Sequence, residues 1–122
     1  MMSLLYEHAT NGVFYIDKGV VIDIFNHSVV KQGKHYSLSR LQYRLMLCLA
    51  SQANQLVKKD ALMQKVWGTT HVSLNDLHLC VSRTRKVLEE SPSRPKYLRT
   101  IHGQGYILRV YFDVVTSQPA LR

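Results

Sequence analysis

The sequence predicts an α+β fold in which an N-terminal antiparallel β-sheet is followed by three helices and a C-terminal β-hairpin. Three observations predict it. Short apolar runs alternate with turn residues as far as Leu38, three later stretches repeat apolar residues at helical spacing, and a final stretch alternates around Gly103 and Gly105. At 122 residues, 46% of them hydrophobic, the chain has the size of one domain with its own core.

Residues 12–110 are predicted to form this domain, with residues 1–11 as an N-terminal extension and residues 111–122 as a tail or the start of a linker. Between Gly12 and Leu38, turn residues separate short apolar runs, which indicates a small antiparallel sheet of three or four strands. The runs are Val13–Ile16, Val20–Phe25 and Ser28–Val30, and the turns lie at 17–19 and 32–34.

Two helices are expected next. Ser39, with Gln42 at the third helical position, makes a capping box that predicts a helix to about Gln52. A second, shorter helix is expected from about Lys59 to Val66. Helical spacing places Leu41, Leu45, Cys48 and Leu49 on the buried side of the first helix, and Leu62, Val66 and Trp67 on that of the second.

A third helix is predicted over about residues 73–90. Ser73 and Asp76 make a capping pair at its start, and Pro92 supplies the stop. At about 3.6 residues per turn, this helix has two unlike faces. One face carries Leu77, Val81, Thr84 and Leu88, and the opposite face carries Asn75, Leu79, Ser82, Arg83 and Lys86.

The third helix also carries a cluster of basic residues. Most such clusters only solvate an exposed helix. This one has no interleaved acid before Glu89 and Glu90, so it lacks the ion-pair pattern of an ordinary exposed face. We therefore favour the interpretation in which Arg83, Arg85 and Lys86 face nucleic acid.

The segment Tyr97–Arg109 predicts a β-hairpin that turns at Gly103, Gln104 and Gly105. Glycine at two turn positions permits a positive φ and the close approach of another backbone. The Gly-Gln-Gly tripeptide does not indicate a nucleotide site, because no helix follows it. The polar side chains are of kinds that contact phosphates and fix register without distinguishing bases: Arg99, Thr100, His102 and Arg109.

The chain has a net charge of +8 at pH 7, and the excess lies mostly in its second half. Between Lys58 and Arg109 there are ten Lys or Arg against four acids. A polyanionic partner follows from this charge. An anionic membrane surface would also match it, but the basic residues are spread over a helix, a loop and a hairpin. A helix suited to a groove and a hairpin suited to the adjoining backbone point to duplex DNA.

Other classes of function find no support. The chain has eight acidic residues, none arranged as a close pair, and no nucleophile or phosphate-loop motif, so no enzyme is predicted. His78 and Cys80 would point about 200° apart on a helix, and no metal or other cofactor is expected. Cys48 and Cys80 are expected to be buried thiols. The apolar run Leu45–Ala50 is too short for a membrane span, and with no signal peptide we expect a cytoplasmic location.

These segments together resemble the winged-helix output domain of the OmpR/PhoB-type transcription regulators. The resemblance covers about Gly12 to Val110. It is carried by LSRLQYRLMLCL in the first helix, DALMQKVWG in the second, VSRTRKVL in the third and LRTIHGQGYIL in the hairpin, which is the wing of that family. Each motif alone is weak, and their order makes the match specific.

The resemblance implies that the third helix enters the major groove, that the wing reaches a minor groove, and that the loop between the second and third helices contacts RNA polymerase. His78, Ser82 and His102 depart from residues common at these positions in the family, so the base preference of a relative does not transfer. The predicted DNA-binding residues are Asn75, His78, Leu79, Ser82, Arg83, Arg85 and Lys86 in the helix and Arg99, Thr100 and His102 in the wing; the polymerase-facing loop is Thr69, Thr70, His71 and Val72.

The expected function is a transcription regulator that binds double-stranded DNA at specific sequences, with two copies as a homodimer on adjacent half-sites. Family members usually place a receiver domain before this module, yet only about eleven residues precede the first predicted strand. The chain therefore looks like the cytoplasmic, N-terminal module of the ToxR or CadC subgroup, anchored in the inner membrane by a segment absent from this chain. A small free-standing regulator is the alternative context, and a protein-binding winged-helix module without a specific DNA site is the alternative function.

Overall fold

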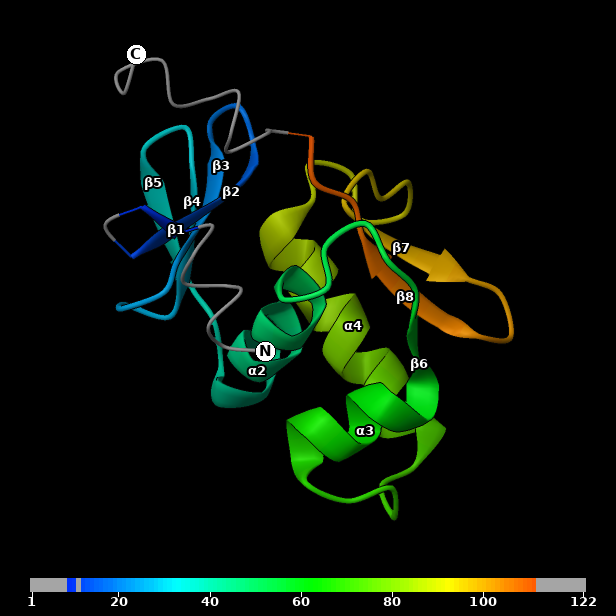
Figure 1. Cartoon of the computed structure of the whole chain (residues 1–122). Coiled ribbons are helices and arrows are strands. Elements are labelled where there is room, and N and C mark those ends of the chain that lie inside the picture. The colour runs from blue at the N-terminus through cyan, green and yellow to red at the C-terminus, as the bar shows by residue number, and fades with distance from the viewer. Residues whose placement is uncertain (1–8, 11, 112–122) are drawn as a thin grey trace.

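The structure is a computed structural model that describes residues 9–10 and 12–111. Helices α2 and α4 lie between two antiparallel sheets, and α3 lies at the end of the domain away from the first sheet (Figure 1). This is the predicted fold. The helices are α2 (Arg40–Ala50), α3 (Lys59–Trp67) and α4 (Leu74–Leu88).

The first sheet has five strands in chain order, one more than the most that was predicted. They are β1 (Ala9–Thr10), β2 (Val13–Asp17), β3 (Val20–Asp23), β4 (Ser28–Lys31) and β5 (Lys34–Ser37). Strand β1 lies inside the predicted N-terminal extension, where Ala9 pairs with Phe14, so the sheet begins before residue 12. Strand β5 is exposed along its whole length, so it shows none of the apolar alternation by which a strand is found in sequence.

Helix α2 begins as predicted, with Ser39 and Gln42 in a reciprocal capping box. The predicted burial of Leu41 is wrong, because its side chain is 37% exposed at the first turn. Met46 is fully buried instead, so the buried side of α2 is rotated from the predicted stripe.

Helix α4 begins at the predicted Ser73–Asp76 capping box but ends at Leu88, before the predicted end at residue 90. Pro92 lies three residues beyond the C-cap residue Glu89. Glu89 has an extended backbone, and its carboxylate, 3% exposed, accepts hydrogen bonds from the backbone N–H groups of Lys96, Tyr97 and Leu98 at 2.7 to 3.2 Å. A buried carboxylate thus ends the helix and anchors the strand that follows the loop.

The second sheet has the order β6–β8–β7, with β6 (Val57–Lys58), β7 (Leu98–Ile101) and β8 (Gly105–Leu108). Strands β7 and β8 form the predicted hairpin, while β6 was not predicted. Gly103 has φ +75°, and a Cβ at Gly105 would overlap the Val57 carbonyl of β6. The two glycines therefore serve the two purposes expected of them, a left-handed turn and a close backbone approach.

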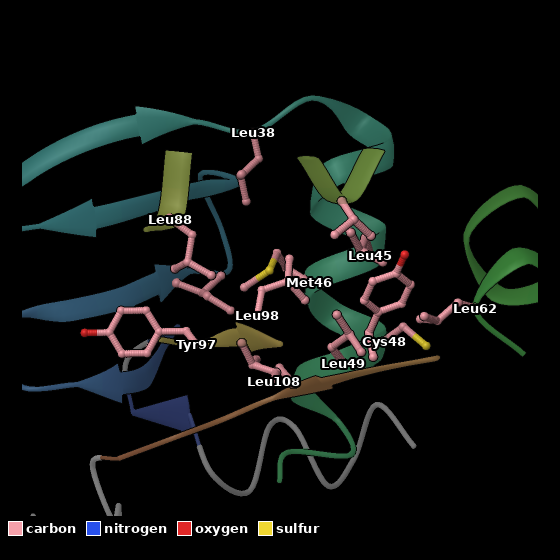
Figure 2. Packing of buried hydrophobic residues seen from close by; sticks show 14 of the residues in the cluster. Leu38, Leu45, Met46, Cys48, Leu49, Leu62, Leu88, Tyr97, Leu98 and Leu108 are labelled. Atoms are coloured by element: carbon pink, nitrogen blue, oxygen red, sulfur yellow. The ribbon is translucent and has the colours of Figure 1, made fainter. Parts of the chain in front are cut away.

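One apolar core joins both sheets to all three helices (Figure 2). Thr84 is fully buried in it, and its hydroxyl donates to the Cys80 carbonyl at 2.7 Å, so this polar position on the apolar face of α4 is satisfied. Cys48 and Cys80 are buried free thiols, and burial raises the pKa of both. Among the described residues, no helix has the length and hydrophobicity needed to cross a membrane.

A polar link joins the first sheet to the hairpin. The Tyr97 hydroxyl donates to Asp17 at 2.8 Å, and the Lys96 ammonium lies 3.1 Å from the same carboxylate. Burial and the neighbouring Asp17 raise the pKa of Tyr97 well above its ordinary value. The N–H of Tyr111 also donates to the carbonyl of Ile16 at 2.7 Å. These bonds fix the hairpin, which follows α4, against the sheet at the other end of the domain.

Candidate nucleic-acid interface

Helix α4 presents an exposed face that is polar except for Leu79. Its buried side comprises Leu77, Cys80, Val81, Thr84 and Leu88. The predicted DNA-facing residues other than Arg85 are all exposed, because they occupy the opposite arc of the helix. We call these residues the α4 face: Asn75, His78, Leu79, Ser82, Arg83 and Lys86.

Arg83 is the most available cation at the middle of this face. It forms no hydrogen bond or ion pair with another described residue, and it is exposed. Leu79, one turn before it, is 42% exposed and supplies an apolar contact surface. Together they offer a donor pair and a methyl-binding contact of the types that distinguish base edges in a major groove.

Arg85, a predicted DNA contact, is bonded to the hairpin in the structure. Arg85 is half-buried, with Nε donating to the Leu98 carbonyl at 2.9 Å and Nη2 donating to Thr100 Oγ1 at 2.7 Å. Its guanidinium lies 5.9 Å from the centre of the Tyr106 ring, and burial lowers its pKa. The wheel position of Arg85, at the hairpin side of the α4 face, brings it within reach of β7. Arg85 therefore fixes the hairpin to the helix.

The hairpin projects beside helix α4 (Figure 1). Arg99, Thr100 and His102 are all exposed, as their predicted role requires, although the Thr100 hydroxyl already accepts the bond from Arg85. Glycine at position 103 turns the tip, where the Gln104 N–H donates to the Ile101 carbonyl at 2.9 Å.

A cleft of about 420 Å³ separates α4 from the hairpin. We call it the helix–hairpin cleft, and its polar lining includes Lys59, His78, Arg85, Thr100 and His102. Lys59, at the start of α3, was missed by sequence reasoning. It reaches the cleft because its N–H donates to the Gln104 carbonyl at 3.1 Å, next to the unpredicted pairing of β6 with β8.

The loop between α3 and α4 is only partly open. Thr70 and His71 are exposed, whereas Thr69 is half-buried and its Oγ1 accepts the His71 N–H at 3.1 Å. Val72, the fourth residue of the predicted polymerase-facing loop, is partly buried and packs against the core. Only Thr70 and His71 extend fully from the loop.

The described residues hold no group of three or more His, Cys, Asp or Glu side chains that could bind a metal ion. The main carboxylates near α4 are occupied: Asp76 accepts from the N–H and hydroxyl of Ser73, and Glu89 accepts backbone N–H groups. What the arrangement offers chemically is a basic and polar surface on two adjacent elements, suited to binding a polyanion.

The family profile described as "Transcriptional regulatory protein, C terminal" matches residues 33–108, a range that includes all three helices and the second sheet. The DNA-binding response regulator MtrA of Mycobacterium leprae is 35% identical to the chain over 88 residues. These residues are 71% of this chain and 39% of MtrA, so the chain spans about two fifths of that regulator's length.

Solved structures agree with this match. The response regulator DrrB of Thermotoga maritima, described as an OmpR/PhoB homolog, has a TM-score of 0.75 at 28% identity, covering 88% of this chain and 49% of DrrB. The DNA-binding domain of Klebsiella pneumoniae RstA, solved in complex with the RstA box, has a TM-score of 0.67 at 27% identity, covering 75% of this chain and 91% of that domain. MtrA and DrrB are response regulators by name.

Proposed function

The chain belongs to the family of transcriptional regulatory protein C-terminal domains, of the OmpR/PhoB winged-helix type, and on that premise we propose that it regulates transcription by binding double-stranded DNA at specific sequences. MtrA, its relative, is described as a DNA-binding response regulator, and the related RstA domain was solved on its own DNA box.

The observation that carries the proposal is the α4 face beside the hairpin, held there by the two bonds from Arg85 to Leu98 and Thr100. A helix about 10–12 Å across fits a major groove about 12 Å wide. With α4 in that groove, the hairpin lies over the neighbouring sugar-phosphate backbone and reaches the next minor groove.

Each exposed residue then has a role that follows from its chemistry. Arg83 is the base-contacting donor, with guanine as its natural partner. Asn75, His78 and Ser82 add polar contacts, and Leu79 packs on a thymine methyl. Lys86 binds phosphate, as do Arg99, Thr100 and His102 in the wing; Arg85 orients the wing.

Several finer features are part of the same proposal. Thr70 and His71, the exposed residues of the α3–α4 loop, are suited to contact RNA polymerase. One module makes few contacts, so specific occupancy calls for two copies on adjacent half-sites. The ToxR or CadC type of membrane anchoring is proposed from the sequence resemblance, and the cytoplasmic location from the short apolar runs of the sequence. The relative MtrA is by name a response regulator.

The proposal is tested by selecting duplexes from a random pool with the purified chain. The affinity for the selected duplex is then compared with that for a scrambled duplex of the same length and salt concentration. We expect a preference above about tenfold, since each correct base contact contributes about 1–3 kcal/mol. A protein-binding module of the same shape would enrich no sequence, and Arg83→Ala would then change nothing specific to sequence.

A further inference from the structure

The helix–hairpin cleft contains two of the proposed DNA-contacting residues, His78 and His102. His78 enters it from α4, and His102 enters it from the hairpin turn. Both side chains are exposed, and neither forms a hydrogen bond with another described residue. They face one space of about 420 Å³ from two different elements.

The charged groups around this space are of one sign. The titratable side chains that line it are Lys59 from α3, His78 and Arg85 from α4, and His102 and Tyr106 from the hairpin. Among the described residues that line the cleft, none carries a carboxylate. Arg85 is already bonded to Leu98 and Thr100, so Lys59 and the two histidines are the groups left to bind an anion.

The position of the cleft identifies that anion. If α4 lies in the major groove and the wing in the next minor groove, the strand between the grooves crosses the gap between helix and hairpin. Its phosphodiester groups are anionic and accept hydrogen bonds from cations. The ligand is therefore a backbone phosphate of the bound duplex.

We propose that His78 and His102 together clamp this phosphate in their protonated forms, so that the chain takes up protons when it binds DNA and binds more tightly as the pH falls. The inference rests on the proposed DNA binding and concerns its regulation at the same site. Histidine is the side chain that ordinarily changes charge between about pH 5 and pH 8, whereas the phosphodiester stays anionic over that range.

The direction in which DNA affinity changes with pH follows from the linkage between protonation and DNA binding. The bound phosphate stabilises the protonated imidazole over the neutral one, so protonation and DNA binding favour each other. Lowering the pH protonates the histidines in advance and increases the affinity. Two charge-assisted contacts at a solvent-exposed site would give roughly a tenfold gain between about pH 8 and pH 6.

The dependence on salt supplies an independent measure. The slope of log affinity against log salt is about −0.9 per neutralised phosphate charge. Neutralising the one phosphate held by the two histidines would make the slope steeper by about 0.9 at the lower pH. Carboxyl groups ordinarily titrate below this range, so they contribute little to the change.

The experiment measures the affinity of the wild-type chain for its selected duplex, at several salt concentrations, near pH 8 and near pH 6. The same series is run with His78→Gln, His102→Gln and the double variant. Two controls match it. His35→Gln removes an exposed histidine from β5 in the other sheet, and Lys59→Gln removes a permanent charge from the cleft itself.

We expect wild type and His35→Gln to bind more tightly and with a steeper salt slope at the lower pH, and the double variant to lose most of both changes. Lys59→Gln should weaken binding at both pH values and keep the pH response. The inference is overturned if the wild-type affinity does not change with pH, or if the affinity of the double variant changes with pH as much as that of wild type. Neither result contradicts DNA binding itself. A chain that binds no duplex at both pH values refutes the proposed function itself.

Discussion

Replacing Arg85 tests whether this side chain orients the wing or contacts DNA directly. Arg85→Lys keeps the positive charge, but an ammonium cannot reproduce bonds from Nε and Nη2 to Leu98 and Thr100 at once. A hydrogen bond contributes about 0.5–1.5 kcal/mol net, and more where a charged donor is buried. Because Arg85 is only half-buried, we expect the free energy of unfolding to fall by about 1–2 kcal/mol.

Urea unfolding followed by circular dichroism measures this loss. For a domain of this size, with a slope near 1–1.5 kcal/mol per M urea, the midpoint should fall by about 1 M. Arg83→Lys is the matched control on the exposed part of α4, and its stability should stay within about 0.5 kcal/mol of wild type. A double-mutant cycle of Arg85→Lys with Thr100→Val should give a coupling energy of about 0.5–1.5 kcal/mol.

The two roles of Arg85 differ in outcome. A wing that is held less firmly must be ordered during binding, so Arg85→Lys should also weaken binding to the selected duplex by roughly threefold to tenfold. Wild-type stability for Arg85→Lys, together with no coupling to Thr100, would refute the orienting role. Weaker DNA binding under those conditions would instead make Arg85 a direct phosphate contact.

Three further predictions follow from single side chains. Arg83→Ala should reduce the binding free energy for the selected duplex by about 1–3 kcal/mol and relax specificity at one base pair, whereas Lys86→Ala should weaken binding to all duplexes alike. An equal loss of affinity for selected and scrambled DNA on Arg83→Ala would make Arg83 a phosphate contact. Glu89→Gln leaves a buried amide facing three backbone N–H donors, so urea unfolding should show a free energy of unfolding about 2–4 kcal/mol lower than that of wild type. A loss below about 0.5 kcal/mol would contradict the anchoring role of Glu89. Burial of Asp17 works against ionisation, but hydrogen bonds from Tyr97, the Lys18 N–H and Lys96 still hold the pKa of this carboxyl below its ordinary value. Its stabilisation is present above the unfolded pKa and lost as the pH falls, so the difference in melting temperature between wild type and Asp17→Asn should shrink from neutral pH toward about pH 3; a difference that does not change with pH would contradict it.

The helices could be predicted because their signals are local. Ser39 with Gln42 and Ser73 with Asp76 fix two starts within one turn, and the apolar spacing fixes which side of α4 is buried. The hairpin was equally accessible, since Gly103 and Gly105 lie between β-forming residues. Periodicity alone predicted the exposure of the α4 face except for His78, which was predicted from the family resemblance.

What sequence could not supply depends on contacts between distant residues. Strand β6 has two residues and exists only because β8 pairs with it, which also brings Lys59 to the cleft. Arg85 belongs to neither face of the helical wheel, and only the placement of β7 shows that its guanidinium bonds to the hairpin. Glu89 similarly ends α4 through N–H groups seven to nine residues later in the chain.

The central claim is that the α4 face and the hairpin bind duplex DNA together. Titrating the isotope-labelled chain with its selected duplex, and following amide and side-chain shifts by NMR, tests this claim directly. The largest changes should lie on the exposed side of α4, at the hairpin turn and at Lys59, with β2 to β5 nearly unchanged. Shift changes centred on the five-stranded sheet, or changes on α4 without any at the hairpin, would contradict it.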